Sequence, residues 1–182
     1  MDKLREMGIK LAFLNEQESF EGTFAAIDKV GILVNREAEA TDIVVGMQNK
    51  IDDTVEAVEA LGKTEKPKVY YMVGYGQQDF TAGGDTFIGE IINLAGGDNI
   101  AQNIQGWAIS REQILESQPD IIIIPNDTAT LEELQQTEFY KDLDAVKSGK
   151  VYEINGDIIS RQGPRIVDAL VDIAKIINPE LV

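Results

Sequence analysis

Four consecutive isoleucines, Ile121 to Ile124, constrain the fold of this chain more than any other feature. The run lies between Pro119-Asp120 and Pro125, so it is much too short for a membrane span, which needs about 20 apolar residues. It is also too uniformly apolar for a strand with one wet face, where apolar and polar residues would alternate. We therefore predict a parallel strand covered on both faces and ended by Pro125, within an α/β fold.

The segment before this strand has the pattern of a capped helix. Ser110 is followed three residues later by Gln113, which is typical of a capping box. The helix should end near Ser117, and Arg111 and Glu112 should lie on its exposed first turn.

Strand-like and helix-like patterns alternate along most of the chain, as a parallel sheet requires. The expected elements are a strand at 8–14, a helix from about Phe20, a long helix at 37–61, a strand at 68–73, a helix at 86–94, a short helix after the capping box of Thr130 and Glu133, a strand at 151–154, and a last helix that begins at Gly163-Pro164 with Pro164 in its first position.

The long helix at 37–61 should span roughly 35 Å. Only one expected strand precedes it, and a single parallel strand can neither pair its backbone groups nor cover both faces. We expect residues 1–35 to be a remnant of an N-terminal lobe, 36–62 a linking helix and 63–182 a C-terminal α/β lobe. Either the chain is truncated or another copy supplies the missing sheet in a domain swap.

Composition excludes several classes of function. The 32 acidic and 16 basic residues give a net charge of −16, which opposes binding to nucleic acid or an anionic membrane surface. The chain has neither Cys nor His, so disulfides, thiol catalysis and imidazole bases are excluded, and a zinc or manganese site would need carboxylates alone. No apolar stretch reaches the length of a membrane helix and no leader begins at Met1, so any export signal was removed or never present.

Four segments, in this order and spacing, resemble motifs of the substrate-binding proteins of ABC importers for cobalamin, haem and iron-siderophore complexes. They are 94–100 (LAGGDNI), 109–115 (ISREQIL) with Pro119-Asp120, 145–152 (AVKSGKVY), and Gly163-Pro164-Arg165. The resemblance implies two α/β lobes that are joined by one long helix and hold a metal chelate between them, with part of the N-terminal lobe missing here.

This resemblance also implies what the protein does. It would capture a chelate outside the cytoplasmic membrane and deliver it to a membrane permease, with no catalytic step and no cofactor of its own. A ferric siderophore is the first expectation for the ligand, cobalamin the second and haem a third. The full-length protein would be periplasmic or extracellular and anchored in the membrane as a lipoprotein, after removal of its signal peptide.

Glu112 is the residue that the resemblance assigns to the permease. A glutamate at this point of the family's motif pairs with arginines of the permease, and a second glutamate does so from the N-terminal lobe, which is missing here. The alternative is purely local, because any carboxylate in the first turn of a helix is stabilised by the helix dipole.

The expected ligand contacts are aromatic and charged. Trp107 is the only tryptophan, and its indole offers a flat face to a macrocycle, although it could instead pack between lobes and is displaced by one residue from the family's tryptophan. Asp157 and Arg161 resemble a pair that lines the cleft of cobalamin-binding members, and a guanidinium there could bind carboxylate or catecholate oxygens. The other candidates are Phe80, Tyr75 and Arg165, of which Arg165 more often has a structural role.

Tyr75 and Phe80 lie in a glycine-rich loop at 74–84, after an expected strand, where open α/β sheets bind ligands. The loop lacks the Gly-Lys-Ser/Thr ending of a phosphate-binding loop. The alternative function is a cytoplasmic flavodoxin-like or nucleotide-binding enzyme whose carboxylates bind Mg²⁺.

We also expect this chain to self-associate. The missing strands of an N-terminal lobe should leave apolar faces uncovered around Ile9, Leu11, Phe13 and Phe24.

Overall fold

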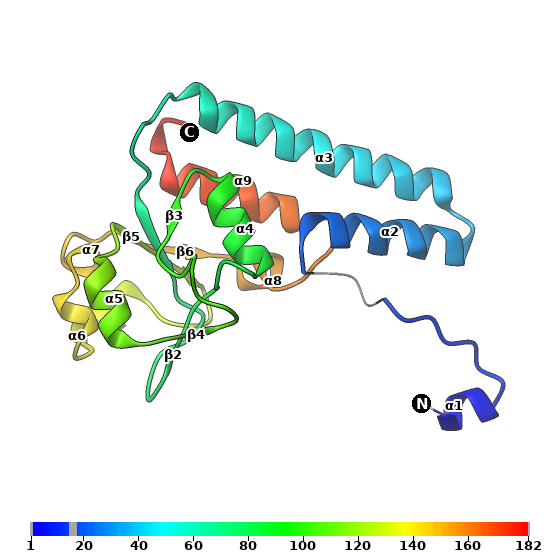
Figure 1. The fold of residues 1–182 in the computed structure, drawn as a ribbon, viewed down its shortest axis with the longest axis horizontal. Coiled ribbons are helices and arrows are strands. Elements are labelled where there is room, and N and C mark those ends of the chain that lie inside the picture. The colour runs from blue at the N-terminus through cyan, green and yellow to red at the C-terminus, as the bar shows by residue number, and fades with distance from the viewer. Residues whose placement is uncertain (1, 15–17, 182) are drawn as a thin grey trace.

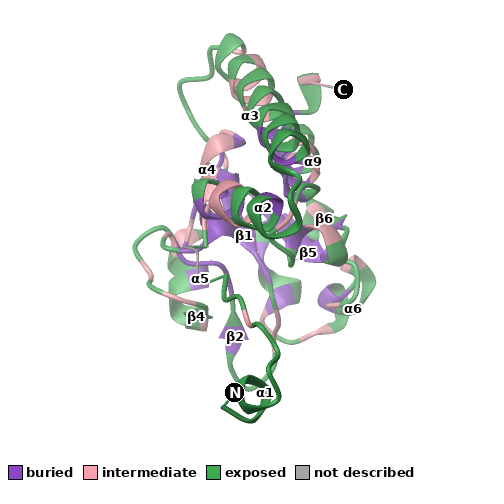
Figure 2. Ribbon diagram, turned by 90° about the vertical axis from the view of Figure 1, so that its right-hand side faces the viewer, coloured by how far each residue is buried: buried purple, intermediate pink, exposed green. Residues whose placement is uncertain are grey.

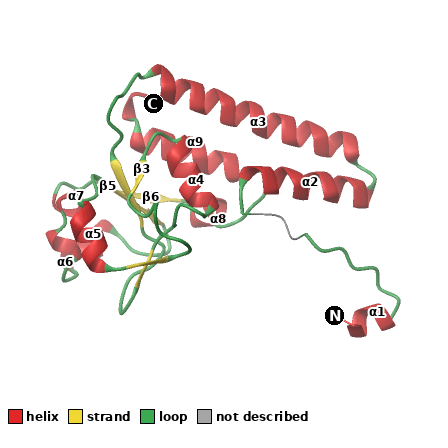
Figure 3. Cartoon of the chain, viewed as in Figure 1, coloured by secondary structure: helices red, strands yellow, loops and turns green. Residues whose placement is uncertain are grey.

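The computed structural model describes residues 2–14 and 18–181 (Figures 1 and 3). Its elements, in chain order, are α1 (Asp2–Glu6), α2 (Phe20–Val34), α3 (Glu37–Ala60), β1 (Lys68–Tyr71), β2 (Asp79–Phe80), α4 (Phe87–Leu94), β3 (Asp98–Asn99), β4 (Ala108–Ile109), α5 (Arg111–Ser117), β5 (Ile121–Pro125), α6 (Leu131–Gln136), the 3₁₀ turn η1 (Tyr140–Asp142), α7 (Asp144–Lys147), β6 (Val151–Ile154), α8 (Gly156–Ile159), α9 (Ile166–Ile177) and the 3₁₀ turn η2 (Pro179–Leu181).

A four-stranded parallel sheet in the order β3-β1-β5-β6 forms the centre of the fold. Strand β5 lies between β1 and β6, with Val69 opposite Ile121 and Ile122 opposite Val151. All five of its residues are buried. The predicted parallel strand with two covered faces is therefore confirmed, and so is the α/β fold class.

The isoleucines of β5 divide between two cores, because neighbouring side chains of a strand point to opposite faces. Ile121 and Ile123 belong to a cluster with residues of α2, α3, α4 and α9. Ile122 and Ile124 belong to a second cluster with residues of α5, α6, η1 and α7. Helices thus cover both faces of the sheet, and the buried residues concentrate along it (Figure 2).

Helix α3 confirms the predicted long helix and lies alongside α9 (Figure 1). Lys50 of α3 forms an ion pair with Asp168 of α9. Just after α3, Lys63 Nζ lies 2.9 Å from Glu180 Oε2 in η2. The antiparallel partner of α3 is α2, and the two meet where Gly31 and Ala40 are buried.

The predicted strand at 8–14 is wrong. Residues 9–14 are irregular, and Ile9, Phe13 and Leu14 are exposed. The alternation of apolar residues there resembles that of a strand, but no strand among the described residues pairs with them, and unpaired backbone groups do not hold a strand. The proposed division into lobes at 35 and 62 stays a prediction.

The predicted start of the last helix is also wrong by two residues. Pro164 lies in a turn, closed by a hydrogen bond from Ile166 N to Gly163 O at 3.0 Å, and α9 begins at Ile166. Arg165, with φ −82° and ψ −6°, precedes the helix. The turn occupies the residues that the proline pattern assigned to the helix.

Glu90 of α4 holds the start of α2. Its Oε2 accepts a hydrogen bond from the backbone N–H of Phe20 at 3.2 Å. Burial raises the pKa of Glu90 above its usual value, the Phe20 N–H opposes this increase, and the charge of Glu21 adds to it. The folded state therefore favours the protonated carboxyl.

Because the pKa of Glu90 is raised on folding, its contribution to stability is complete below the unfolded pKa, about 4.3, and is lost as the pH rises through the folded value. We expect Glu90→Gln, which keeps an acceptor for Phe20, to increase the free energy of unfolding at pH 7 and to give no such increase at pH 4. Urea unfolding at both pH values measures this. Glu59→Gln, at an exposed position of α3, is the control, and an equal gain from Glu90→Gln at both pH values would contradict the expectation.

Candidate functional site

The carboxyl end of β6 leads directly into the residues of the first candidate site. Asn155 follows the strand and caps α8, its Oδ1 accepting hydrogen bonds from the N–H groups of Asp157 at 3.0 Å and Ile158 at 3.3 Å. Asn126, which follows β5, accepts a hydrogen bond from the N–H of Gly156 at 3.3 Å. Two asparagines therefore fix α8 at the edge of the sheet where ligands of α/β folds bind.

Three charged candidates meet beside α8. Asp157, Arg161 and Arg165 line one hollow of about 180 Å³. Arg161 Nη2 lies 3.1 Å from Asp157 Oδ1, and both side chains are largely exposed. An exposed pair of this kind contributes only about 0–1 kcal/mol, so an anionic ligand can readily replace the aspartate. The lining of the hollow thus includes two arginines and one aspartate.

The backbones that carry two further aromatic candidates, Phe80 and Trp107, are paired in another part of the structure. Strands β2 and β4 pair antiparallel, with Phe80 opposite Ala108, and the N–H of Thr81 donates to the carbonyl of Trp107 at 2.7 Å. Phe80 is 41% exposed and Trp107 36% exposed. The sequence did not predict the short β2–β4 ribbon, which carries Phe80 and directly follows Trp107, and each of these side chains is partly exposed. The hollow around Asp157 includes neither of them.

Tyr75 is placed differently from the other aromatic candidates. Its ring meets that of Tyr140 edge-on, with centroids 5.4 Å apart and an angle of 76° between the planes. The residue is half-buried against the second core. Packing against Tyr140 accounts for its position without a ligand.

Glu112 occupies the exposed first turn of α5. The capping box predicted for this helix is confirmed, with Gln113 N donating to Ser110 Oγ and Ser110 N donating to Gln113 Oε1. The Glu112 carboxylate makes no hydrogen bond or ion pair with any residue that the structure describes. It borders a groove of about 420 Å³ whose other wall includes Gln77 and Gln78.

The sequence pattern predicted that Arg111 lies exposed on this turn, but its guanidinium is bound to other segments. Its Nε is 3.0 Å from Asp79 Oδ2, and its Nη2 donates to the carbonyl of Gly76 at 2.7 Å. The hydrogen bond with Asp79 raises the pKa of Arg111 above its ordinary value. Asp79 and Arg111 are 32 positions apart, so no local spacing pattern in the sequence could have indicated this pair.

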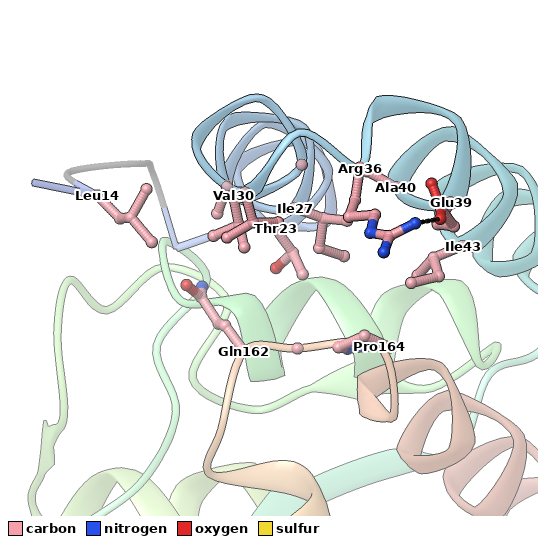
Figure 4. Close-up of a pocket in the computed structure, with 14 residues that line it drawn as sticks. Leu14, Thr23, Ile27, Val30, Arg36, Glu39, Ala40, Ile43, Gln162 and Pro164 are labelled. Carbon is pink, nitrogen blue, oxygen red and sulfur yellow. Dashed lines mark hydrogen bonds and ion pairs between the residues drawn. The ribbon is translucent and has the colours of Figure 1, made fainter. Parts of the chain in front are cut away.

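An apolar groove of about 540 Å³ runs between the α2–α3 hairpin and the turn at 162–164 (Figure 4). Leu14, Ile27, Val30 and Ile43 are among its lining side chains, and an ion pair of Arg36 with Glu39 at 2.9 Å lies at one end. The neighbouring Ile32, Leu33 and Val34 are exposed as well. Of the apolar residues expected to be uncovered, Ile9 and Phe13 are exposed, Leu11 is half-buried, and Phe24 packs against the first core.

Within residues 2–14 and 18–181, no group of three or more carboxylates is arranged so that it could hold a metal ion. None of the described helices combines the length and the apolar character that crossing a membrane requires.

Residues 1–158 match the periplasmic binding protein family, and the chain belongs to this family. Among curated relatives, it is 27% identical over 179 residues to the uncharacterized ABC transporter substrate-binding lipoprotein YvrC of Bacillus subtilis, covering 98% of this chain and 57% of YvrC. It is 27% identical over 181 residues to a cobalamin-binding protein of Halobacterium salinarum, covering 94% of this chain and 48% of that protein. The chain thus spans about half the length of these relatives.

A solved structure has the same fold. The structure of a possible iron-binding (periplasmic solute-binding) protein from Staphylococcus epidermidis superimposes with a TM-score of 0.85 at 26% identity, covering 97% of this chain and 69% of that one. The resemblance that the four motifs indicated is therefore confirmed at the level of the family and the fold.

Proposed function

We propose that this chain is the ligand-capturing component of an ABC importer for a metal chelate. The observation that carries the proposal is the hollow formed by Asp157, Arg161 and Arg165 at the carboxyl edge of the sheet. A siderophore, a corrinoid or haem combines a bulky body with peripheral oxygens or amides, and the two arginines can bind such oxygens in bidentate fashion. Phe80 and Trp107 offer ring faces to the body of the ligand.

A ferric siderophore is the ligand we favour, because the two guanidinium groups suit anionic oxygens better than the neutral amides of a corrinoid. Cobalamin is the second candidate and haem the third. No catalytic step and no resident cofactor belong to this role. Delivery would take place at the outer face of the cytoplasmic membrane, with the full-length protein anchored there as a lipoprotein, the class to which the name of the Bacillus subtilis relative assigns that protein.

Glu112 would bind the permease. Its support is geometric, since the carboxylate is exposed and unpaired among the described residues and borders a groove that could admit a basic side chain. The proposed partner surface is therefore cationic, with arginine the best match to a carboxylate.

Purification of the full-length protein from its native host, followed by mass spectrometry of the bound small molecule, tests the proposal. We expect an iron or cobalt chelate. A bound nucleotide would contradict the proposal and favour the enzyme alternative.

We further propose that the 182-residue chain forms dimers through the apolar groove beside α2 and α3. The exposed Ile32, Leu33 and Val34 support this, since clusters of exposed apolar side chains favour association. Light scattering should give a mass of two chains, and a stable monomer at high concentration would contradict the proposal.

A further inference from the structure

Arg111 precedes Glu112 on α5, but its contacts lie on other segments. Its guanidinium binds Asp79 of β2 through Nε and the carbonyl of Gly76 through Nη2. One side chain therefore ties the first turn of α5 to the loop at 74–80 at two separate points.

Asp79 completes this connection. Its side chain is only 2% exposed, and its Oδ1 also accepts a hydrogen bond from the N–H of Gly76 at 3.2 Å. In the β2–β4 ribbon, Asp79 lies opposite Ile109, two residues before Arg111. The loop, the ribbon and the start of the helix thus share one buried carboxylate.

Two aromatic rings lie close to the guanidinium of Arg111. The Arg111 Cζ lies 5.4 Å from the centre of the Phe139 ring and 5.9 Å from that of Tyr140, within the range of a cation–π interaction. Burial raises the pKa of Tyr140, and the nearby Asp79 raises it further. A lysine lacks this planar fork, because its three donors share one nitrogen, so it cannot place separate nitrogens at Asp79 and at the Gly76 carbonyl as Arg111 does.

The consequence is a separation of charges within one turn. The positive charge of Arg111 is engaged by Asp79, whereas Glu112 keeps an exposed carboxylate with no partner among the described residues. The groove next to Glu112 is lined by Gln77 and Gln78 from the same loop that holds Arg111. Movement of α5 relative to this loop would change both the direction of the carboxylate and the shape of the groove.

We propose that Arg111, through Asp79, is a positioning residue that holds Glu112 in the orientation needed to bind the permease. This inference rests on the docking role proposed for Glu112. It assigns Arg111 no contact with the ligand or the permease.

Three variants of the full-length protein test the inference: Arg111→Met, the double variant Asp79→Asn with Arg111→Met, and Glu112→Gln. Two quantities are measured, the midpoint of thermal unfolding and the affinity for the cognate ABC permease in lipid nanodiscs by surface plasmon resonance. Arg111→Met should lower both, because it leaves the Asp79 carboxylate buried and unpaired. The double variant removes that buried charge, so its midpoint should return towards the wild-type value. Its affinity should nevertheless stay about ten-fold weaker, since the tether is gone.

The outcomes distinguish the positioning role of Arg111 from the docking role of Glu112. Wild-type affinity of the double variant would overturn the positioning role and leave Arg111 with a structural one. Wild-type affinity of Glu112→Gln would overturn the docking role itself. Arg111→Lys adds a check by conservative substitution. It should not fully restore the affinity, because lysine has no planar fork with which to reach Asp79 and the Gly76 carbonyl from two separate nitrogens, and full restoration would contradict the proposed geometry.

Discussion

Replacing Glu112 by arginine should weaken binding of the full-length protein to its permease by about 100-fold. The substitution removes a carboxylate that attracts basic groups and adds a positive charge that repels them, so both changes weaken binding. The fold should tolerate the change, because the side chain is exposed and unpaired among the described residues. Binding to the permease in nanodiscs, at two salt concentrations, measures the effect.

Glu132→Arg is a matched control for this variant. Glu132 occupies the same position after the Thr130 cap of α6 that Glu112 occupies after the Ser110 cap of α5, and both are exposed. Each substitution loses the same interaction with a helix dipole, about 0.3–1 kcal/mol. Equal effects of the two variants on permease binding would show that Glu112 has only the local, helix-stabilising role.

Truncating Ile123 to alanine should lower the free energy of unfolding by about 2–4 kcal/mol. Ile123 is 0% exposed in the middle of the sheet and belongs to the core beneath α4 and α9. The loss combines the transfer of buried methylenes with the cavity that remains. Urea unfolding of the 182-residue chain at low concentration measures it.

Ile32→Ala provides the comparison, because Ile32 is 64% exposed on α2. Its effect should stay within about 0.5 kcal/mol. Equal destabilisation by both variants would contradict the assignment of β5 to the buried centre of the sheet. An effect of Ile32→Ala that increases with protein concentration would instead support association through the α2–α3 face.

The fold was predictable wherever local chemistry decides the structure. The isoleucine run required two apolar faces, and the serine and threonine caps gave the starts of α5 and α6. The prediction of a strand at 8–14 was wrong because a strand is stabilised by the strands beside it, and the alternation of apolar and polar residues carries no information about those strands. The prediction that Pro164 begins the last helix was wrong because a proline is equally compatible with a turn and with the first residue of a helix.

The candidate site was predictable in part. Asp157, Arg161 and Arg165 are close in the sequence and follow one strand, so their meeting in one hollow follows from local geometry. The neighbouring positions of Phe80 and Trp107 depend on the two-residue ribbon β2–β4, which is too short to give a periodic pattern. The Asp79–Arg111 pair depends on tertiary packing alone. The roles of all these residues remain predictions.

Direct titration with chelates tests the central claim that this protein captures a metal complex. The full-length protein would be titrated with a ferric hydroxamate siderophore, cyanocobalamin and haemin, with tryptophan emission and chelate absorbance as readouts. We expect saturable 1:1 binding of at least one chelate with a Kd of about 1 μM or lower, with quenching of tryptophan emission and a change in chelate absorbance that saturate together. Absence of saturable binding for all three chelates would contradict the claim.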